Sequence, residues 1–116
     1  MIRFYPSGDD GPVREYLETL RVDPRRKEAW AKLTVDLSVL QAEGIRSGRI
    51  TVKKVVGVKG SVWELVRPYE GMAYRIYFCL KKGEAWLIHW VEKKSRKIPV
   101  NDLNVIGKRA KEVFRK

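Results

Sequence analysis

The stretch 73-AYRIYFCLKKGEAWLIHWV-91 decides the fold of this chain. Two runs of hydrophobic and aromatic residues, Ala73–Leu80 and Ala85–Val91, flank a short turn sequence that contains glycine. Strand-forming runs on both sides of such a turn are typical of a β-hairpin. The two-residue period of a strand places four large apolar side chains of the first run on one face: Tyr74, Ile76, Phe78 and Leu80. The opposite face receives Arg75, Tyr77 and Cys79.

Further strands are predicted upstream of this hairpin. The run Val62–Arg67 has the same strand-forming composition, and Ile2–Ser7 predicts a short strand that ends in turn residues. The segment 45-IRSGRITVKKVVGVKGS-61 is basic, β-branched and interrupted by glycines. It predicts a loop that contains a short strand.

Two stretches near the N-terminus have the spacing of apolar residues that is typical of amphipathic helices. The first begins near Pro12, a residue that suits the first helical turn. The second is predicted to begin with Asp23 as N-cap and Pro24 at the first helical position, and to end at Gly44. We expect these two helices to pair as a hairpin.

The final stretch, 101-NDLNVIGKRAKEVFRK-116, predicts a third helix that begins near Asn101 or Asp102 and buries one apolar stripe. The element order β-α-α-β-β-β-α predicts a single α+β domain over residues 1–116. We expect an antiparallel sheet with the helical hairpin and the C-terminal helix packed on one face. The other face, which carries Arg75, would then be a concave basic surface suited to a phosphodiester backbone.

The composition excludes several classes of protein. The chain has 116 residues and is 44% hydrophobic, which fits one globular domain. No segment approaches the roughly 18 consecutive apolar residues of a membrane span, and the N-terminus lacks the features of a signal peptide. Cys79 is the single cysteine, so an intramolecular disulfide and a cysteine-based zinc site are excluded. We expect a cytoplasmic protein with no membrane partner.

The positive charge of the chain is unevenly distributed. The net charge is +11; residues 1–43 hold 7 basic and 8 acidic side chains, and residues 44–116 hold 18 and 6. Four cations follow the apolar run of the last strand within five residues: Lys93, Lys94, Arg96 and Lys97. Because like charges repel, such a one-sided excess favours a polyanionic partner, with RNA or DNA as the first candidate.

Three motifs occur in an order that resembles a known family: VWELVRPYEGMAYRIYF at 62–78, AWLIHWVEKKSRKIP at 85–99, and the helix that follows them. The chain is similar to the RelE/HigB superfamily of bacterial toxins, in particular to its phage-derived HigB-like branch. That resemblance implies a small microbial-RNase-like fold and the cleavage of mRNA, usually in the ribosomal A site. It also implies a cognate antitoxin that blocks the basic face in a toxin–antitoxin hetero-oligomer, and no metal or organic cofactor.

The resemblance also assigns residues. The arginine of the family's "YRI-Y" strand is Arg75, the paired lysines are Lys93 and Lys94, and the carboxylate of the "WEL" strand is Glu64. One departure is that Val66 stands where the family has an arginine, and Arg67 follows it. Without a bulge, strand alternation sends Arg67 to the face opposite Glu64.

RNA can be cleaved without a metal because its 2′-hydroxyl attacks the adjacent phosphate. The protein must orient the reacting groups, remove the 2′-proton, stabilise the phosphorane and protonate the leaving oxygen. We expect Arg75 to be the main stabiliser, with Lys93 and Lys94 beside it. Glu64 or His89 is the candidate base, and His89, Tyr77 or a lysine is the candidate acid. Further RNA-binding candidates are Lys53, Lys54, Arg67, Arg96, Lys97 and Trp90.

Several of these residues have a structural alternative. His89 can be a hydrogen-bonded sheet histidine, and Tyr77 and Trp90 can be packing residues. Glu64 can pair with Arg75 across strands and hold the arginine in place. The lysine cluster can be a solvated strand end.

Three functions remain open at this point. The first is an endoribonuclease toxin that depends on the ribosome and is held in check by an antitoxin. The second is a non-catalytic RNA- or ribosome-binding protein of the same fold, which Val66 favours. The third is a phage or plasmid protein whose basic face selects an acidic protein.

Overall fold

The computed structural model describes residues 1–95 and 97–115. Its elements, in chain order, are β1 (Ile2–Phe4), α1 (Pro12–Val22), α2 (Lys27–Glu43), β2 (Thr51–Lys54), β3 (Val62–Tyr69), β4 (Met72–Lys81), β5 (Glu84–Lys93) and α3 (Val100–Arg115). This is the predicted α+β order, with each of the three long strands close to its predicted range. None of the helices in the described part of the chain is long and apolar enough to cross a membrane.

The five strands form one sheet in the order β1-β5-β4-β3-β2. The pairs β2–β3, β3–β4 and β4–β5 are antiparallel, as predicted, but β1 pairs with β5 in parallel. The sheet is therefore mixed, and the expectation of a wholly antiparallel sheet is wrong. Turns between neighbouring strands revealed three antiparallel pairings, whereas β1 reaches the free edge of β5 from the far end of the chain.

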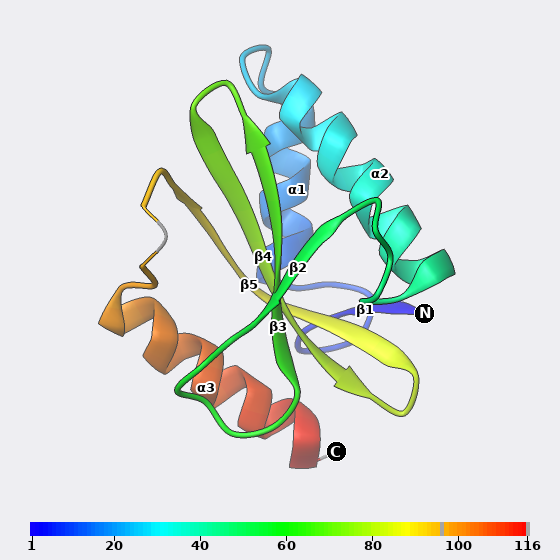
Figure 1. Ribbon diagram of the computed structural model, residues 1–116, viewed down its shortest axis with the longest axis vertical. Coiled ribbons are helices and arrows are strands. Elements are labelled where there is room, and N and C mark those ends of the chain that lie inside the picture. Colours follow the sequence, from blue (N-terminus) through cyan, green and yellow to red (C-terminus); the bar gives the residue numbers. More distant parts are fainter. Residues whose placement is uncertain (96, 116) are drawn as a thin grey trace.

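The helices cover both faces of the sheet, contrary to the prediction that they share one (Figure 1). The α1–α2 hairpin packs on the face that carries Ile76 and Phe78, and we call this the hairpin face. Helix α3 packs on the face that carries Tyr77 and Cys79, the α3 face. Both of these last residues are fully buried, because β4 is apolar on both sides and each side requires a cover.

Two helix starts differ from the prediction by a few residues. Helix α2 begins at Lys27, because Asp23 starts a turn and its carboxylate accepts a hydrogen bond from the Arg25 backbone N–H at 2.9 Å. Helix α3 begins at Val100, before the predicted N-caps. The predicted end of α2 is confirmed: Gly44 has φ of 81°, and its N–H donates to the Leu40 carbonyl.

A register shift in the β4–β5 hairpin determines where His89 points. Tyr77 pairs with His89, Phe78 pairs with Leu87, and Ile88 is left between them as an extra residue. Strict alternation from Leu87 would place His89 on the hairpin face. The shift places it on the α3 face beside Tyr77 instead, which is the usual effect of a β-bulge.

Candidate functional site

A row of four polar side chains crosses the α3 face of the sheet. In the strand register Lys53 lies opposite Glu64, Glu64 opposite Tyr77, and Tyr77 opposite His89. Directly opposed residues share a face, and their Cβ atoms are neighbours. The sheet thus brings four predicted site residues together from β2, β3, β4 and β5.

Arg75 lies in the next row and reaches back to this one. Its Nη1 donates to Glu64 Oε1 at 3.0 Å, and its Nη2 donates to the Ser95 backbone carbonyl at 2.8 Å. The two charged residues are 6% and 5% exposed. The cross-strand pairing of Glu64 with Arg75, anticipated as an alternative, is confirmed. It holds the carboxylate in a fixed position below the segment that follows β5.

The Glu64 carboxylate faces a cavity of about 330 Å³. Lys53 and Lys54 line one side of this cavity, and Ile98 and Leu103 line another. The cavity is therefore lined by a glutamate, two lysines and an apolar wall, although the Lys54 ammonium group itself lies over the Trp63 ring. These are the groups needed to bind a phosphate beside a general base.

His89 is held by two residues of α3. Its Nε2 lies 2.8 Å from Asp102 Oδ1, and its Nδ1 lies 3.5 Å from Arg109 Nη1. The same Arg109 nitrogen donates to the carbonyl of the extra residue Ile88 at 2.7 Å. Since Arg109 can only donate, Nδ1 acts as acceptor and Nε2 carries the proton that bonds Asp102. Both ring nitrogens are thus engaged, and the pair fastens the first turn of α3 to the bulge of β5.

Asp102 and Arg109 were not predicted as site residues. The sequence offered Asp102 only as a helix cap, and Arg109 only as one cation among many. The signal that would have identified them is the bulge at Ile88, which no local pattern in the sequence reveals.

The remaining reactive groups of this face hold their protons. Tyr77 is fully buried, and burial, reinforced by the negative charge of Glu64, raises the pKa of its hydroxyl well above the usual value. Burial also raises the pKa of the Cys79 thiol to about 12. Neither group is therefore ready to ionise near neutral pH. In the described part of the chain no group of three or more His, Cys, Asp or Glu residues could hold a metal ion.

The predicted lysines lie in the open around the row. Lys53, Lys93, Lys94 and Lys97 are exposed, and none of them makes an ion pair with a residue that the structure describes. Lys93 ends β5 on the α3 face, opposite Ala73. Arg96, also predicted to bind RNA, lies outside the described residues.

Three predicted RNA-binding residues lie on the hairpin face instead. Arg67 donates from Nε and Nη2 to the Asp36 carboxylate on α2, at 2.8 and 2.5 Å. Trp90 stacks on Tyr16 of α1 with ring centroids 3.9 Å apart, and Lys54 Nζ lies 5.1 Å from the Trp63 ring centroid. Strand alternation separates these side chains from the row of Glu64, as anticipated for Arg67. Only Lys54 also lines the cavity over Glu64.

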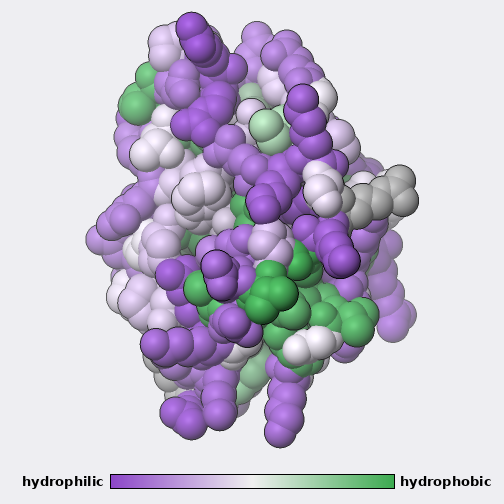
Figure 2. Space-filling model, turned by 90° about the vertical axis from the view of Figure 1, so that its left-hand side faces the viewer, coloured by the Kyte–Doolittle hydropathy of each residue, from purple (hydrophilic) through white to green (hydrophobic). Residues whose placement is uncertain are grey.

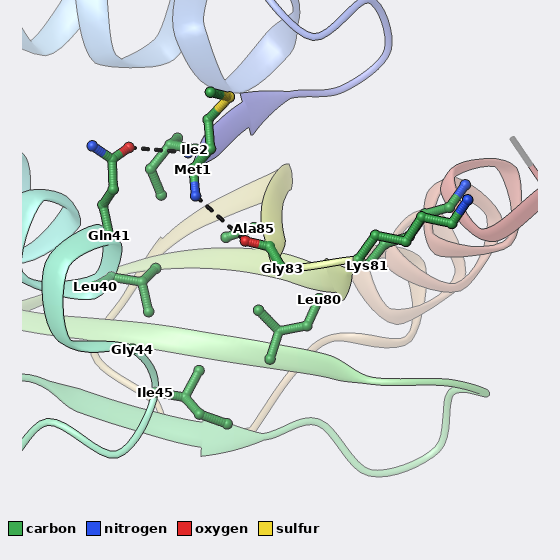
Figure 3. A pocket seen from close by; sticks show the side chains of 11 residues that line it. Met1, Ile2, Leu40, Gln41, Gly44, Ile45, Leu80, Lys81, Gly83 and Ala85 are labelled. Atoms are coloured by element: carbon green, nitrogen blue, oxygen red, sulfur yellow. Dashed lines mark hydrogen bonds between the residues drawn. The ribbon is translucent and has the colours of Figure 1, made fainter.

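A second pocket, of about 390 Å³, lies at the end of the sheet near the N-terminus (Figure 3). Its walls are largely apolar, and the side chains of Leu40, Ile45 and Leu80 lie between the strands and α2. Two of its nitrogen donors already have acceptors: the Met1 ammonium group donates to the Gly83 carbonyl, and the Ile2 backbone N–H donates to the Gln41 side chain. None of the described residues that line this pocket has a carboxylate side chain, so the pocket is not a candidate for the chemistry described above.

Comparison with known families identifies a match over most of the chain. The profile of the family described as "Phage derived protein Gp49-like (DUF891)" matches residues 17–111. The matched range begins within α1 and ends within α3, so it includes the whole row of polar residues, Arg75 and the lysines around them. No curated protein and no solved structure matches the chain significantly.

Proposed function

The chain belongs to the Gp49-like family of phage-derived proteins, and from this premise we propose that it is the toxin of a toxin–antitoxin pair and an mRNA endoribonuclease. Its substrate is mRNA in the ribosomal A site, and its partner in the resting state is the antitoxin. Toxin and antitoxin both act in the cytoplasm. The placement within the RelE/HigB superfamily is part of this proposal.

The observation that carries the proposal is the Arg75–Glu64 pair on the α3 face. A carboxylate beside a guanidinium, with Lys53 opposite and unpaired lysines nearby, matches the demands of RNA cleavage by the 2′-hydroxyl. The carboxylate can accept a proton, and the cations can hold the charge that develops on the phosphoryl oxygens. A purely structural ion pair would not need these exposed lysines, which have no acidic partner among the described residues, because exposed like charges destabilise one another.

In the proposed reaction Glu64 accepts the proton of the 2′-hydroxyl as the 2′-oxygen bonds to phosphorus. The bond from phosphorus to the 5′-oxygen breaks, which leaves a 2′,3′-cyclic phosphate and a 5′-hydroxyl end. Arg75 fixes Glu64 and stabilises the dianionic phosphorane, and Lys93 and Lys94 bind flanking phosphates.

The proton for the leaving oxygen comes from a lysine in this scheme, and Lys53 is the best placed. It faces Glu64 across the strands and is exposed at the cavity. Tyr77 is a poor acid because its pKa is raised, and His89 has both ring nitrogens engaged by α3. His89 is then a positioning residue that sets the distance between α3 and the row.

Access to Arg75 requires a movement. One guanidinium nitrogen of Arg75 already donates to the Ser95 carbonyl, and the Arg75 side chain is almost completely buried. We therefore include in the proposal that RNA displaces the segment after β5 and that a phosphate oxygen replaces the Ser95 carbonyl. Lys94 and Lys97 on that segment would travel with the bound RNA.

The test maps mRNA 5′ ends in a bacterial translation mixture, with and without ribosomes, for the wild type, Arg75→Ala and Arg75→Lys. Discrete cuts that need both ribosomes and Arg75 are expected, with partial activity in the lysine variant. Circular dichroism checks that each variant is folded, because Glu64 loses its partner in Arg75→Ala. Equal cutting by wild type and folded Arg75→Ala would exclude Arg75 from the reaction, and intact mRNA throughout would exclude the nuclease.

A second function, binding of RNA or ribosomes without cleavage, is favoured by Val66. This buried side chain lies directly opposite Arg75 on the α3 face. The RelE/HigB superfamily, which the chain resembles, has a second arginine at this position. Val66→Arg separates the two functions. Cleavage that appears only in this variant would identify the wild type as a binding protein, whereas cleavage by the wild type excludes the alternative.

A further inference from the structure

A groove between α3 and the loop that precedes β3 takes no part in the proposed reaction. Its volume is about 920 Å³. The floor is apolar and consists of Val58, Leu103 and Phe114. The rim carries four cations: Lys59, Lys108, Lys111 and Arg115. None of the described residues that line the groove has a carboxylate side chain.

The groove is held open by close packing of the loop on α3. A Cβ atom at Gly60 would lie 2.5 Å from the Phe114 ring, and one at Gly107 would lie 3.5 Å from the Val58 side chain. Gly60 also has φ of +90°, a conformation that other residues rarely adopt. The loop and the helix thus form the groove before any ligand binds, which lowers the cost of ordering on binding.

Exposed apolar side chains continue from the groove toward the cavity over Glu64. Val56 is 85% exposed and Val100 is 72% exposed, and these are the two most exposed large apolar residues in the described part of the chain. Figure 2 shows an apolar area on this side of the molecule with hydrophilic side chains around it. Leu103 lines both the groove and the cavity, so the two adjoin at this side chain.

We propose that this groove binds an acidic amphipathic segment of a partner protein. An apolar centre surrounded by a charged rim is the anatomy of a protein interface, and an all-cationic rim is complementary to carboxylates. RNA fits less well, because bases stack on aromatic rings and the floor offers one ring among aliphatic side chains. The lining of α3 from Leu103 to Arg115 is about 18 Å long at 1.5 Å per residue, enough for about three helical turns of a bound segment.

The position of the groove gives the interaction a consequence for the site. A segment that crosses Leu103 enters the cavity over Glu64, and a carboxylate there meets Lys53. The partner would therefore exclude RNA while most of its contacts lie outside the catalytic row. The identification of this partner as the antitoxin rests on the proposed function, whereas the chemistry of the groove does not.

The test selects ligands from a displayed library of random peptides about 16 residues long, a length that covers the groove as a helix. Selection uses the immobilised wild-type protein, and dissociation constants are then measured for labelled peptides. The groove variants are Lys108→Glu/Lys111→Glu, which reverses two exposed rim charges, and Lys59→Glu, which reverses a third exposed charge on the loop side of the groove. The matched control is Arg25→Glu/Lys27→Glu, which makes the same change in net charge at the hairpin.

The expected peptides are acidic, with apolar residues three or four positions apart. Their affinity should fall at least about tenfold in both groove variants and change little in the control. No enrichment, enrichment of non-acidic peptides, or equal binding to Lys108→Glu/Lys111→Glu would overturn the proposal. Oligouridine that loses affinity for the groove variants when no peptide is enriched would identify an RNA surface instead. Cleavage by the same variants reports on the proposed function separately, because they retain Glu64 and Arg75.

Discussion

Each face of the sheet carries one pair of arginine and carboxylate, and the two pairs are built differently. On the hairpin face Arg67 directs two N–H groups to the Asp36 carboxylate and so fastens β3 to α2. On the α3 face Arg75 gives one N–H to Glu64 and another to the Ser95 carbonyl. The first arginine is committed to one partner; the second is shared between the sheet and a loop.

The surroundings of the pairs differ in the same sense. On the side of Arg67 a second arginine is paired as well: Arg26 of the α1–α2 turn bonds both Asp23 and Glu92. Around Arg75 the exposed Lys53, Lys93 and Lys94 have no acidic partner among the described residues. A buried ion pair by itself is weak grounds for function or for stability. The contrast agrees with our proposal that the α3 face binds an external anion.

The largest effect is expected when the carboxylate of the Arg75 pair is replaced by an amide of the same shape, with the same replacement in the Arg67 pair as the comparison. Glu64→Gln retains an acceptor for Arg75 but cannot take a proton, so we expect the rate of mRNA cleavage to fall about thousandfold. Asp36→Asn is the matched change on the hairpin face, and its cleavage rate per folded molecule should stay within about twofold of the wild type. Both rates are measured from 5′-end formation at equal concentrations of folded protein.

Urea unfolding measures how much the Arg67–Asp36 pair contributes to the free energy of unfolding. Arg67→Ala leaves Asp36 buried without its partner, and the free energy of unfolding should fall by about 3 kcal/mol. If Asp36→Asn or Arg67→Ala abolished cleavage while the protein remained folded, it would be wrong to assign cleavage to the α3 face and a purely structural role to the Arg67–Asp36 pair.

An effect of intermediate size is expected from the lysines at the end of β5. Lys93→Ala/Lys94→Ala removes two phosphate contacts, so affinity for RNA should fall and the slope of log K against log salt should decrease by about two. Lys27→Ala/Lys32→Ala makes the same change in charge on α2 and should leave the slope unaltered. Fluorescence anisotropy over a range of salt concentrations gives both slopes. An unchanged slope for the first variant would place these lysines away from the phosphates.

Much of the fold was predictable because local patterns determine it. The strands β3, β4 and β5 follow from alternation and from the turn at Lys82 and Gly83, whose positive φ values of 50° and 77° suit a tight hairpin. The face taken by α3 was not predictable from Arg75 alone. Tyr77 and Cys79 in β4 require an apolar cover, and their demand outweighs that of a single charged residue.

The candidate site was predictable only where it depends on strand alternation. Alternation anticipated the separation of Arg67 from Glu64, whereas the Glu64–Arg75 pair was one of two alternatives and depends on the register of β3 and β4. It failed for His89, because the extra residue Ile88 reverses the side of the sheet to which the rest of β5 points. The partners of His89 on α3 come from long-range packing, which no short motif in the sequence encodes.

A smaller effect is expected for Trp90, a predicted RNA-binding residue that lies on the hairpin face. Its ring is almost parallel to that of Tyr16, with an interplanar angle of 3°, so α1 already occupies the surface that a base would use. Trp90→Ala should therefore change RNA affinity by less than about twofold, whereas loss of a base-stacking ring costs about 1–3 kcal/mol. Stability should fall, because the stack joins α1 to β5. A tenfold loss of RNA affinity in folded Trp90→Ala would show that RNA contacts both faces.

The smallest effect is expected inside the catalytic row itself, at Tyr77. Its hydroxyl is buried beside Glu64 without a hydrogen bond of normal geometry, and its raised pKa keeps it protonated through the neutral range. Tyr77→Phe removes a buried polar atom that has no good partner, so stability should stay equal or rise slightly. Cleavage should stay within about twofold of the wild type, because a lysine supplies the proton in the proposed mechanism. The pH profile of the cleavage rate should also keep its shape. If Tyr77→Phe lowered the rate a hundredfold with unchanged stability, Tyr77 would be the acid, and the α3 face would use its buried tyrosine where the present mechanism uses an exposed lysine.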